Sequence, residues 1–331
     1  MTGAAASAGA IQPARSNSGP AVRQHPAAEL QSTHPPLRPP LRKDMPCPLS
    51  LCSTRRSTTR TQEAGRRWCS CTATPAPRLW RNVIPNLGRG RLLAPDLIGM
   101  GRSGKPELSY SFADHARYLD AWFDALDLDR VILVGHDWGG ALAFDWATRH
   151  PERVLGTAFL ESIVKPMAWE DLSPQARERW EMIHTPGAGE TMVLEQNLFL
   201  RTAFTGGGVL TPVSDDDMKA YLEPFPTPQS RRPILAWARQ IPLGGEPAEL
   251  VARIETFDAW LATSTSVPKL LLTFEGAPSL LIGNAMVEWC ATHIASLETV
   301  SCGQAGHHAP EDRPKEIAAA ISDWADRHGL R

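Results

Sequence analysis

The most informative stretch of this chain is Val131-Ile132-Leu133-Val134-Gly135-His136-Asp137-Trp138-Gly139-Gly140. Its first half is an almost continuous β-branched and apolar run, which is the pattern of a parallel strand covered on both faces. A helical pattern over 141–149 follows and stops at His150-Pro151, because a residue before proline is disfavoured in a helix. The stretch therefore predicts a strand joined directly to a helix, with Asp137 at the turn between them.

Small residues lie two positions before and two positions after Asp137, at Gly135 and Gly139. This spacing is typical of the nucleophile elbow of α/β-hydrolases, in which a sharp turn exposes the nucleophile above the sheet. A carboxylate at that place is a nucleophile without prior deprotonation, and its attack on carbon would give an alkyl ester on the enzyme. The alternative is a simple helix cap, which is a common role for an aspartate before a helix. The complete pattern at a strand–helix junction favours the nucleophile.

Strand and helix patterns alternate on both sides of this elbow. Apolar runs predict strands at 91–96, 154–160, 269–273 and 297–302, and apolar positions at helical spacing predict helices around 112–127, 283–293 and 315–327. This alternation predicts an α/β fold with a doubly wound, mostly parallel sheet. A helical insertion at 162–262 interrupts the alternation, and we expect it to form a cap over the carboxyl ends of the strands, where such sheets bind ligands. The expected organisation is a core of 66–161 and 263–331 with a cap of 162–262.

The first 78 residues differ in composition from the rest of the chain. They contain 11 of the 29 prolines and 11 of the 34 Lys and Arg residues, but only three of the 36 acids. A Pro-rich sequence with few apolar residues buries too little surface to offset its ordering entropy. We therefore expect 1–65 to be disordered.

The composition also excludes several classes of function. A formal charge of −2 argues against a general nucleic-acid binder. No apolar run approaches the roughly 18 residues that span a bilayer, and the first residues lack the apolar region of a signal peptide. The spacings of Cys47, Cys52 and Cys69-Ser70-Cys71 fit no common zinc site, and Cys290 and Cys302 are expected to be buried free thiols. We expect a cytoplasmic protein with no nucleic-acid, membrane or metal partner.

From Leu79 to its end, the chain resembles the haloalkane dehalogenases, a family of α/β-hydrolases. The matching segments occur in the family's order and include the elbow itself; the others are Leu79–Pro85, Asp96–Ser103, Phe159–Ile163, Arg231–Pro233 and Gly306–Asp312. The resemblance implies hydrolysis of a small apolar halogenated substrate to an alcohol and a halide, without cofactor or metal. We expect the protein to be a monomer.

The resemblance also implies a role for each residue of the site. Asp137 would attack the halogen-bearing carbon, while Trp138 would donate its indole N–H to the halide and its backbone N–H to the oxyanion. His307 would activate water, because the family's base lies four residues before a Glu, here Glu311. The neighbouring His308 falls at a position where the family has a bulky residue, so we expect it to pack.

The acid that orients the base follows from the family's two patterns. One subfamily carries a Glu directly after the strand that follows the elbow helix, and Glu161 matches that position. The other carries an Asp after the next core strand, where this chain has no Asp and Glu275 is only a reserve. The cap residues Phe199 and Trp237 are expected to line the substrate pocket.

The epoxide hydrolases are the closest alternative, because they share the Asp nucleophile and the His-Asp-Trp-Gly-Gly motif. They open epoxides with tyrosine hydroxyls of the cap, usually a pair, whereas the cap here contains Tyr221 alone. They also lack a Glu in the setting of Glu161. The sequence favours the dehalogenase.

One family motif, His-Gly-Asn-Pro after an early strand, is absent from this chain. Its Asn would supply a second halide contact and would fall near Ala73, within Trp68-Cys69-Ser70-Cys71-Thr72-Ala73-Thr74-Pro75, a segment with no strand-like run. Nucleotides that encode this segment can also encode Met-Val-Phe-Val-His-Gly-Asn-Pro when they are read one base earlier. We hypothesise that 66–78 are translated in a shifted frame. The corresponding alternative is a catalytically impaired pseudogene product.

Overall fold

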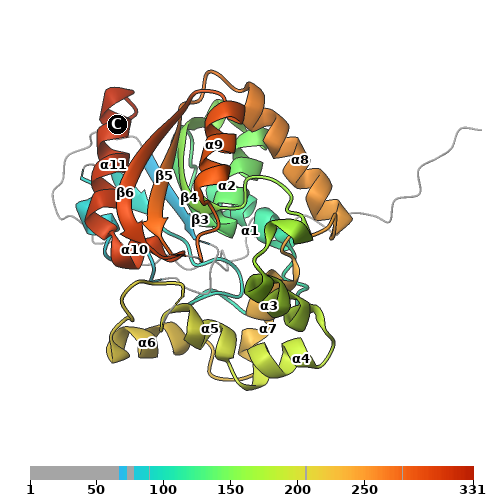
Figure 1. Ribbon diagram of the computed structural model, residues 1–331. Helices are drawn as coiled ribbons and strands as arrows, with labels where there is room; N and C mark the ends of the chain where they lie inside the picture. Colours follow the sequence, from blue (N-terminus) through green and yellow to red (C-terminus); the bar gives the residue numbers. More distant parts are fainter. Residues whose placement is uncertain (1–66, 73–77, 89, 206, 278) are drawn as a thin grey trace, which may run out of the picture. The chain divides into compact units, whose positions relative to one another are not determined.

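The computed structural model describes residues 67–72, 78–88, 90–205, 207–277 and 279–331 (Figure 1). The disorder expected for 1–65 concerns residues outside this part of the chain. None of the helices within the described ranges has the length and apolar character that crossing a membrane requires.

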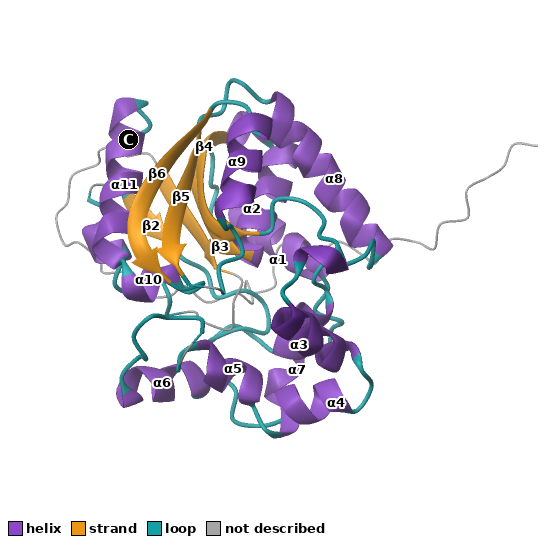
Figure 2. Ribbon diagram, viewed as in Figure 1, coloured by secondary structure: helices purple, strands orange, loops and turns teal. Residues whose placement is uncertain are grey.

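The described residues form a six-stranded sheet in which all neighbouring strands are parallel (Figure 2). The strands lie in the order β2-β1-β3-β4-β5-β6, and their bounds are β1 Arg67–Thr72, β2 Arg91–Leu93, β3 Val131–Asp137, β4 Val154–Ser162, β5 Lys269–Gly276 and β6 Leu297–Ala305. Every residue of β3 is buried, as its apolar run predicts. The predicted doubly wound α/β fold is confirmed.

Helices cover both faces of the sheet. In Figure 1, α1 Phe112–Ala125, α2 Trp138–Arg149, α8 Ala248–Thr263 and α9 Asn284–His293 lie on one face, and α11 Pro314–Arg327 lies on the other. The elbow helix α2 is central, because it packs on β3, β4 and α8 and buries ten of its twelve residues. On the opposite face, α11 buries Ile317, Ile321 and Trp324. The apolar stripes of the helices thus close a core around the buried strands.

A capping box defines the start of α1. The Ser111 hydroxyl accepts a hydrogen bond from the Asp114 N–H at 3.1 Å, and the Asp114 carboxylate accepts one from the Ser111 N–H at 3.3 Å. This exchange satisfies two backbone donors that the first helical turn leaves without partners. The helix then places Phe112, Leu119 and Trp122 in the core.

Shorter helices follow β4 and lie beyond the carboxyl ends of the strands, in the lower half of Figure 1. They are α3 Pro174–His184, α4 Ala188–Glu190, α5 Leu198–Ala203, α6 Asp215–Leu222 and α7 Arg232–Arg239. We call α3–α7 the cap. The last helix of the insertion expected at 162–262, α8, lies instead against α2 beside the sheet.

Arg81 ties the cap to the core. Its guanidinium donates to Glu311 of the short helix α10 (Ala309–Asp312), with 3.0 Å between Nη2 and Oε2, and pairs with Asp217 of α6 at 3.0 Å. Tyr221 of α6 also donates its hydroxyl hydrogen to Glu311. Opposite charges at this junction hold α6 close to the loop that carries His307.

The segment Arg67–Thr72 differs from the sequence-based expectation. Its residues contain no strand-like apolar run, yet their backbone forms β1 between β2 and β3, with Thr72 level with His136. Backbone N–H and C=O groups can complete a ladder whatever the side chains are, and two flanking strands offer partners on both sides. The position expected for the missing Asn, near Ala73, lies outside the described residues.

Candidate active site

Asp137 ends β3 and begins α2 in a strained backbone conformation. Its φ of 54° and ψ of −128° lie in a region that residues other than glycine rarely adopt. The side chain makes no capping hydrogen bond to α2. A simple helix cap, which was the alternative reading of this residue, is therefore not what the geometry shows.

Close backbone packing creates this elbow. A Cβ atom added to Gly135 would lie 2.4 Å from Gly140 Cα, and one added to Gly140 would lie 2.0 Å from Ser162 Oγ. Neither position has room for a side chain. The two glycines therefore let α2 approach both β3 and β4, which holds Asp137 at the edge of the sheet.

Glu161 stands beside the elbow, at the end of the neighbouring strand β4. Its carboxylate, 1% exposed, accepts backbone hydrogen bonds from Leu281 at 2.6 Å and Ile282 at 3.1 Å. Both donors belong to the loop after β5, where the other subfamily would carry its Asp. The reserve residue Glu275 is exposed on β5. The structure thus holds Glu161 as a buried acceptor with a fixed orientation.

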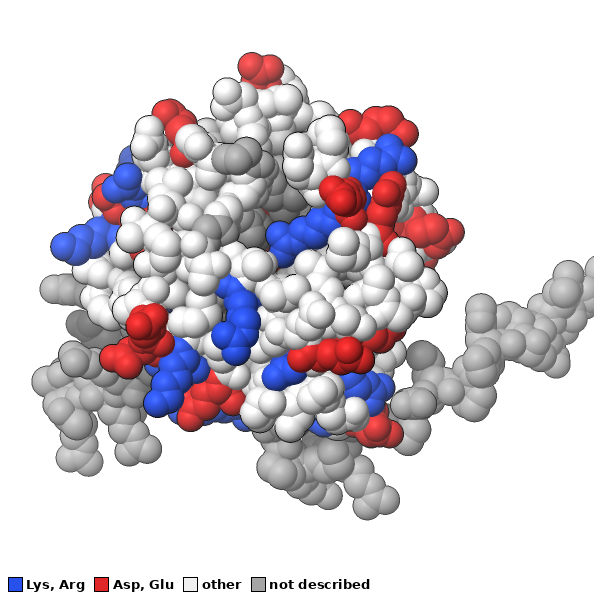
Figure 3. Space-filling view, turned by 60° about the horizontal axis from the view of Figure 1, so that its bottom comes forward, with Lys and Arg blue, Asp and Glu red and all other residues white. Residues whose placement is uncertain are grey.

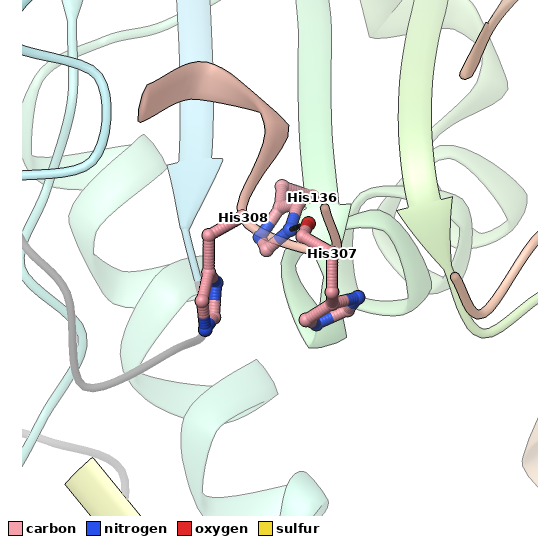
Figure 4. Close-up of side chains that lie close together, drawn as sticks. All are labelled: His136, His307 and His308. Carbon is pink, nitrogen blue, oxygen red and sulfur yellow. Dashed lines mark hydrogen bonds between the residues drawn. The ribbon is translucent and has the colours of Figure 1, made fainter. Parts of the chain in front are cut away.

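His307 follows β6 and completes the group. Its Nδ1–H donates to Glu161 Oε2 at 3.2 Å, and its main-chain carbonyl accepts a hydrogen bond from His136 Nε2 at 2.7 Å. Burial lowers the pKa of His136 to about 3, so this imidazole is neutral and carries a single N–H. Figure 4 shows the His136 ring at the backbone of His307. The loop after β6 is therefore held at two points, the main-chain carbonyl of His307 and its ring.

The charges of Asp137 and His307 act on each other. Burial raises the pKa of Asp137 to about 6, and the positive charge of His307 opposes that rise. Burial lowers the pKa of His307, but its hydrogen bond to Glu161 and the negative charges of Asp137 and Glu161 outweigh this effect, so this pKa lies above its ordinary value. The site combines a carboxylate that ionises near neutrality with an imidazole held by an acid.

His308 points to the other side of the loop from His307 (Figure 4). It is 4% exposed, and its ring stacks on Phe204 with 4.6 Å between centroids and 23° between planes. Burial, followed by the charges of nearby groups, lowers its pKa well below the ordinary value. The ring packs between core and cap.

Three histidines bring ring nitrogens within 4.8 Å of one another, namely His136, His307 and His308. One ring nitrogen of His136 and one of His307 already have partners, because His136 Nε2 donates to the His307 carbonyl and His307 Nδ1 donates to Glu161. A metal ion bound to those two nitrogens would compete with both bonds. We assign the cluster to the orientation of His307 rather than to metal binding.

Aromatic rings surround Trp138, the residue after Asp137. Its ring lies 4.6 Å from that of Trp237 of α7 and 6.0 Å from that of Phe112. Trp237 in turn stacks on His115, with 4.2 Å between centroids. Trp138 and Trp237 are each 3% exposed. The structure brings this predicted cap residue directly against the elbow.

Phe199, the other predicted pocket residue, lies on α5 in the cap. Its ring contacts Trp180 of α3 at 6.3 Å, and the guanidinium of Arg179 lies over it, 5.0 Å from the centroid. Arg179 did not emerge from the sequence analysis. The sequence did carry a signal for it. No acidic residue of this helix lies three or four positions from Arg179, so none of them shares its face of the helix.

Tyr221, the single tyrosine of the cap, is fully buried and faces the salt-bridge network rather than the elbow. It donates to Glu311 and accepts from Arg81 Nη1 at 3.1 Å, and its ring stacks on Phe204 at 4.0 Å. Its hydroxyl hydrogen is therefore already used.

Comparisons with known proteins place this geometry in a family. A family model described as the alpha/beta hydrolase fold matches residues 75–183. A haloalkane dehalogenase of Mesorhizobium japonicum is 46% identical over 249 residues, which make up 74% of this chain and 79% of the relative. One from Sphingobium indicum is 44% identical over 256 residues, or 75% of this chain and 84% of the relative. The chain belongs to the haloalkane dehalogenase family.

Solved structures of haloalkane dehalogenases agree with this assignment. The enzyme DatA from Agrobacterium tumefaciens C58 superposes with a TM-score of 0.75 at 41% identity, covering 80% of this chain and 91% of that one. DbeA from Bradyrhizobium elkani superposes with a TM-score of 0.77 at 37% identity, covering 85% and 98%. The resemblance and the fold class inferred from the sequence are both confirmed. By family, this chain is an enzyme of the haloalkane dehalogenase type, a hydrolase that acts on carbon–halogen bonds.

Proposed function

We propose that this protein hydrolyses haloalkanes to alcohol and halide through an alkyl ester on Asp137. The observation that carries the proposal is the hydrogen bond from His307 Nδ1 to the buried Glu161, next to a carboxylate held at a strained elbow. Family membership supports the same reaction.

The first step is alkylation of Asp137. A carboxylate oxygen attacks the carbon that carries the halogen, the carbon–halogen bond breaks, and the halide leaves with the bonding electrons. Trp138 donates its indole N–H to the departing halide, because its ring is packed beside the elbow between Trp237 and Phe112. Burial of the site favours this step, since a poorly hydrated carboxylate and an apolar surround suit a haloalkane.

The second step is hydrolysis of the ester. His307 takes a proton from water through Nε2, and the resulting hydroxide equivalent attacks the ester carbonyl carbon. Glu161 accepts from Nδ1–H and stabilises the imidazolium that forms. Collapse of the oxyanion releases the alcohol and restores the carboxylate, and His307 then loses the proton to solvent.

Alkylation itself prepares His307 to act as a base. In the free enzyme, the negative charge of Asp137 contributes to the raised pKa of His307. Esterification removes that charge, so the pKa of His307 falls in the intermediate. A larger fraction of the imidazole is therefore neutral in the state in which it must accept a proton.

An epoxide hydrolase activity has less support. Opening an epoxide requires a hydroxyl group that donates its hydrogen to the ring oxygen. The single cap tyrosine, Tyr221, already donates its hydroxyl hydrogen to Glu311. A carboxylate acceptor in a buried setting holds that hydrogen strongly.

The direct test is bromide release from a short bromoalkane by the wild type and by Asp137→Ala. Release by the wild type that is lost in the variant supports the ester mechanism, provided that both proteins unfold cooperatively at similar temperatures. A soluble wild type that unfolds cooperatively but releases no bromide would assign the chain to the impaired class.

The ester can be observed directly in His307→Gln. This variant keeps the nucleophile but lacks the base, so mass spectrometry after exposure to the bromoalkane is expected to show one added alkyl group on the peptide that contains Asp137. An unmodified peptide alongside continued bromide release would contradict the covalent route.

A further inference from the structure

A loop of the cap lies directly against the loop that carries His307. This cap loop, residues 207–210, lies between α5 and α6, and its Gly208 carbonyl accepts a hydrogen bond from the His308 N–H at 2.7 Å. A Cβ atom added to Gly306 would lie 2.5 Å from the Gly208 oxygen. The two backbones are therefore in direct contact, with no room for a side chain between them.

The carboxylate of Asp312 binds both loops. It accepts the Gly306 N–H at 2.8 Å, and both of its oxygens lie 3.1 Å from the Leu210 nitrogen, whose N–H they accept. Asp312 is the last residue of α10, and the residue before it, Glu311, is bound to Arg81. Hydrogen bonds to an ionised acceptor are stronger than those between neutral groups. We call Asp312 and its two backbone partners the Asp312 clamp.

The backbone on both sides of His307 depends on these contacts. The peptide unit after His307 is held at its carbonyl by His136 of the core and at its N–H by Gly208 of the cap. The residue before His307 is Gly306, which lacks a Cβ atom and so has more backbone freedom than any other residue type. Its N–H is fixed by Asp312. The direction of the His307 side chain is therefore set in part by the cap loop and by Asp312.

Three stacked rings strengthen the same junction. The ring of His308 stacks on Phe204, and Phe204 stacks on Tyr221 of α6 with 4.0 Å between centroids; all three side chains are buried. Figure 3 turns the cap toward the viewer and shows acidic and basic side chains next to one another on this surface. Exposed ion pairs of this kind contribute little to stability. The buried rings and the backbone hydrogen bonds are the stronger link between the cap and the loop of His307.

We propose that Asp312 is a positioning residue for ester hydrolysis. By holding Gly306 and the cap loop together, it keeps His307 in the place from which Nε2 takes a proton from water. The inference rests on the proposed function and concerns only its second step. Alkylation uses Asp137 and Trp138 at the elbow, whereas hydrolysis requires a base within hydrogen-bond distance of the attacking water. The bonds made and broken are those of the proposed reaction.

The test separates the two steps in Asp312→Asn. Asparagine keeps the shape of the side chain but replaces one acceptor oxygen with an NH2 group, so at least one backbone N–H loses its partner. Rapid quenching with 1-bromohexane at about pH 8, where Asp137 is ionised, gives the rate of the first bromide release, and mass spectrometry gives the decay of the alkyl-enzyme. We expect hydrolysis to slow about 10- to 100-fold and alkylation to change less than about twofold, so that the alkyl-enzyme accumulates.

Asp217→Asn is the matched control. Its carboxylate also joins the cap to the core, by pairing with Arg81, and the ratio of the two rates should stay at the wild-type value. A second variant, Phe204→Leu, removes the ring on which His308 stacks and should slow hydrolysis in the same direction by a smaller factor. Both rates are measured on the same folded molecules, so a loss of stability lowers the amplitude of the reaction and leaves the ratio unchanged.

Equal slowing of both steps in Asp312→Asn, or hydrolysis at the wild-type rate, would overturn the proposal. If Asp312→Asn does not fold, an unchanged ratio in Phe204→Leu would overturn it as well. Hydrogen–deuterium exchange tests the clamp without turnover. The amides of Gly306 and Leu210 should exchange faster in Asp312→Asn and at the wild-type rate in Asp217→Asn; unchanged exchange at both amides in Asp312→Asn would also contradict the proposal. A wild type that releases no bromide but shows this coupled exchange would reject the proposed function and support the clamp.

Discussion

Two opposing effects act on the pKa of Asp137. Burial disfavours its charge and raises its pKa to about 6, whereas the positive charge of His307 favours the ionised form. The proposed nucleophile must be ionised to attack, so its activity depends on the balance between these effects. Asp137 in turn acts on His307, because its negative charge contributes to raising the pKa of His307.

The pH dependence of alkylation follows from this balance. Because the carboxylate of Asp137 is protonated below its pKa, we expect kcat/KM for a bromoalkane to fall about tenfold per pH unit below about pH 6. In His307→Gln the opposing positive charge is absent, so the pKa of Asp137 rises and the acid limb of the single-turnover alkylation rate moves to higher pH. Rapid-quench measurement of bromide over pH 5–8 checks both, and an acid limb at the same pH in the two proteins would contradict the coupling.

At the level of elements, the elbow depends on how closely two strands and a helix approach. Gly140 of α2 faces Ser162 at the end of β4, and the register of β3 and β4 shifts at His136/Asp137 to admit this contact. The shift brings the proposed nucleophile and the end of β4 to the same edge. A local packing restriction therefore sets the geometry of the site.

Gly140→Ala tests this packing. The new Cβ would lie 2.0 Å from Ser162 Oγ and 2.4 Å from Ser162 Cβ, so we expect a loss of about 1–3 kcal/mol in the free energy of unfolding. Ser162→Gly removes both clashing atoms and should restore part of the loss in the double variant. Urea unfolding of the two single variants and the double variant measures the coupling, and strictly additive effects would argue against direct contact.

A second element-level feature is the network of Arg81, Tyr221 and Glu311 between core and cap. Tyr221→Phe removes the hydroxyl that donates to Glu311, and we expect it to lower the free energy of unfolding by about 1–3 kcal/mol, because a buried carboxylate loses a donor. Bromide release below the unfolding temperature should persist, since the hydroxyl faces Glu311. Loss of bromide release with unchanged thermal stability would instead place Tyr221 in the chemistry.

At the scale of the whole molecule, β1 is the least expected part of the sheet. It lies between β2 and β3, where a parallel sheet is normally apolar on both faces, yet its sequence is Arg-Trp-Cys-Ser-Cys-Thr. The backbone ladder does not depend on side chains, but the free energy of burial does. The shifted-frame hypothesis addresses this mismatch and the absent His-Gly-Asn-Pro motif together.

Replacing Trp68–Pro75 with Met-Val-Phe-Val-His-Gly-Asn-Pro tests that hypothesis in the full chain. Apolar side chains in a central strand should raise the unfolding temperature, and one additional donor to halide or oxyanion is expected to raise bromide release by about 10²–10³-fold. The wild-type chain, measured in parallel, is the reference. A replacement that changes neither quantity would reject the hypothesis, and codons in the gene that are incompatible with the shifted reading would reject it independently.

Local patterns in the sequence were sufficient to predict the described strands other than β1, and they indicated the elbow and the residues of the proposed triad. Two of these signals lie among neighbouring residues, namely the β-branched run and the glycine spacing around Asp137. The third is a match to a family's motifs, which gave the order Asp137, Glu161 and His307. Such patterns predict where elements begin and end, because backbone preferences and the periodic spacing of apolar residues are set within a few positions of the chain. They also predicted that His308 packs, as the structure shows.

Tertiary structure alone decided how these residues are held. The hydrogen bonds from Leu281 and Ile282 to Glu161, and from His136 to His307, join residues more than a hundred positions apart. Likewise, the placement of Arg179 over Phe199 depends on how α3 meets α5. Contacts of this kind depend on which loops the fold brings to one edge of the sheet, and no pattern confined to neighbouring residues encodes that arrangement.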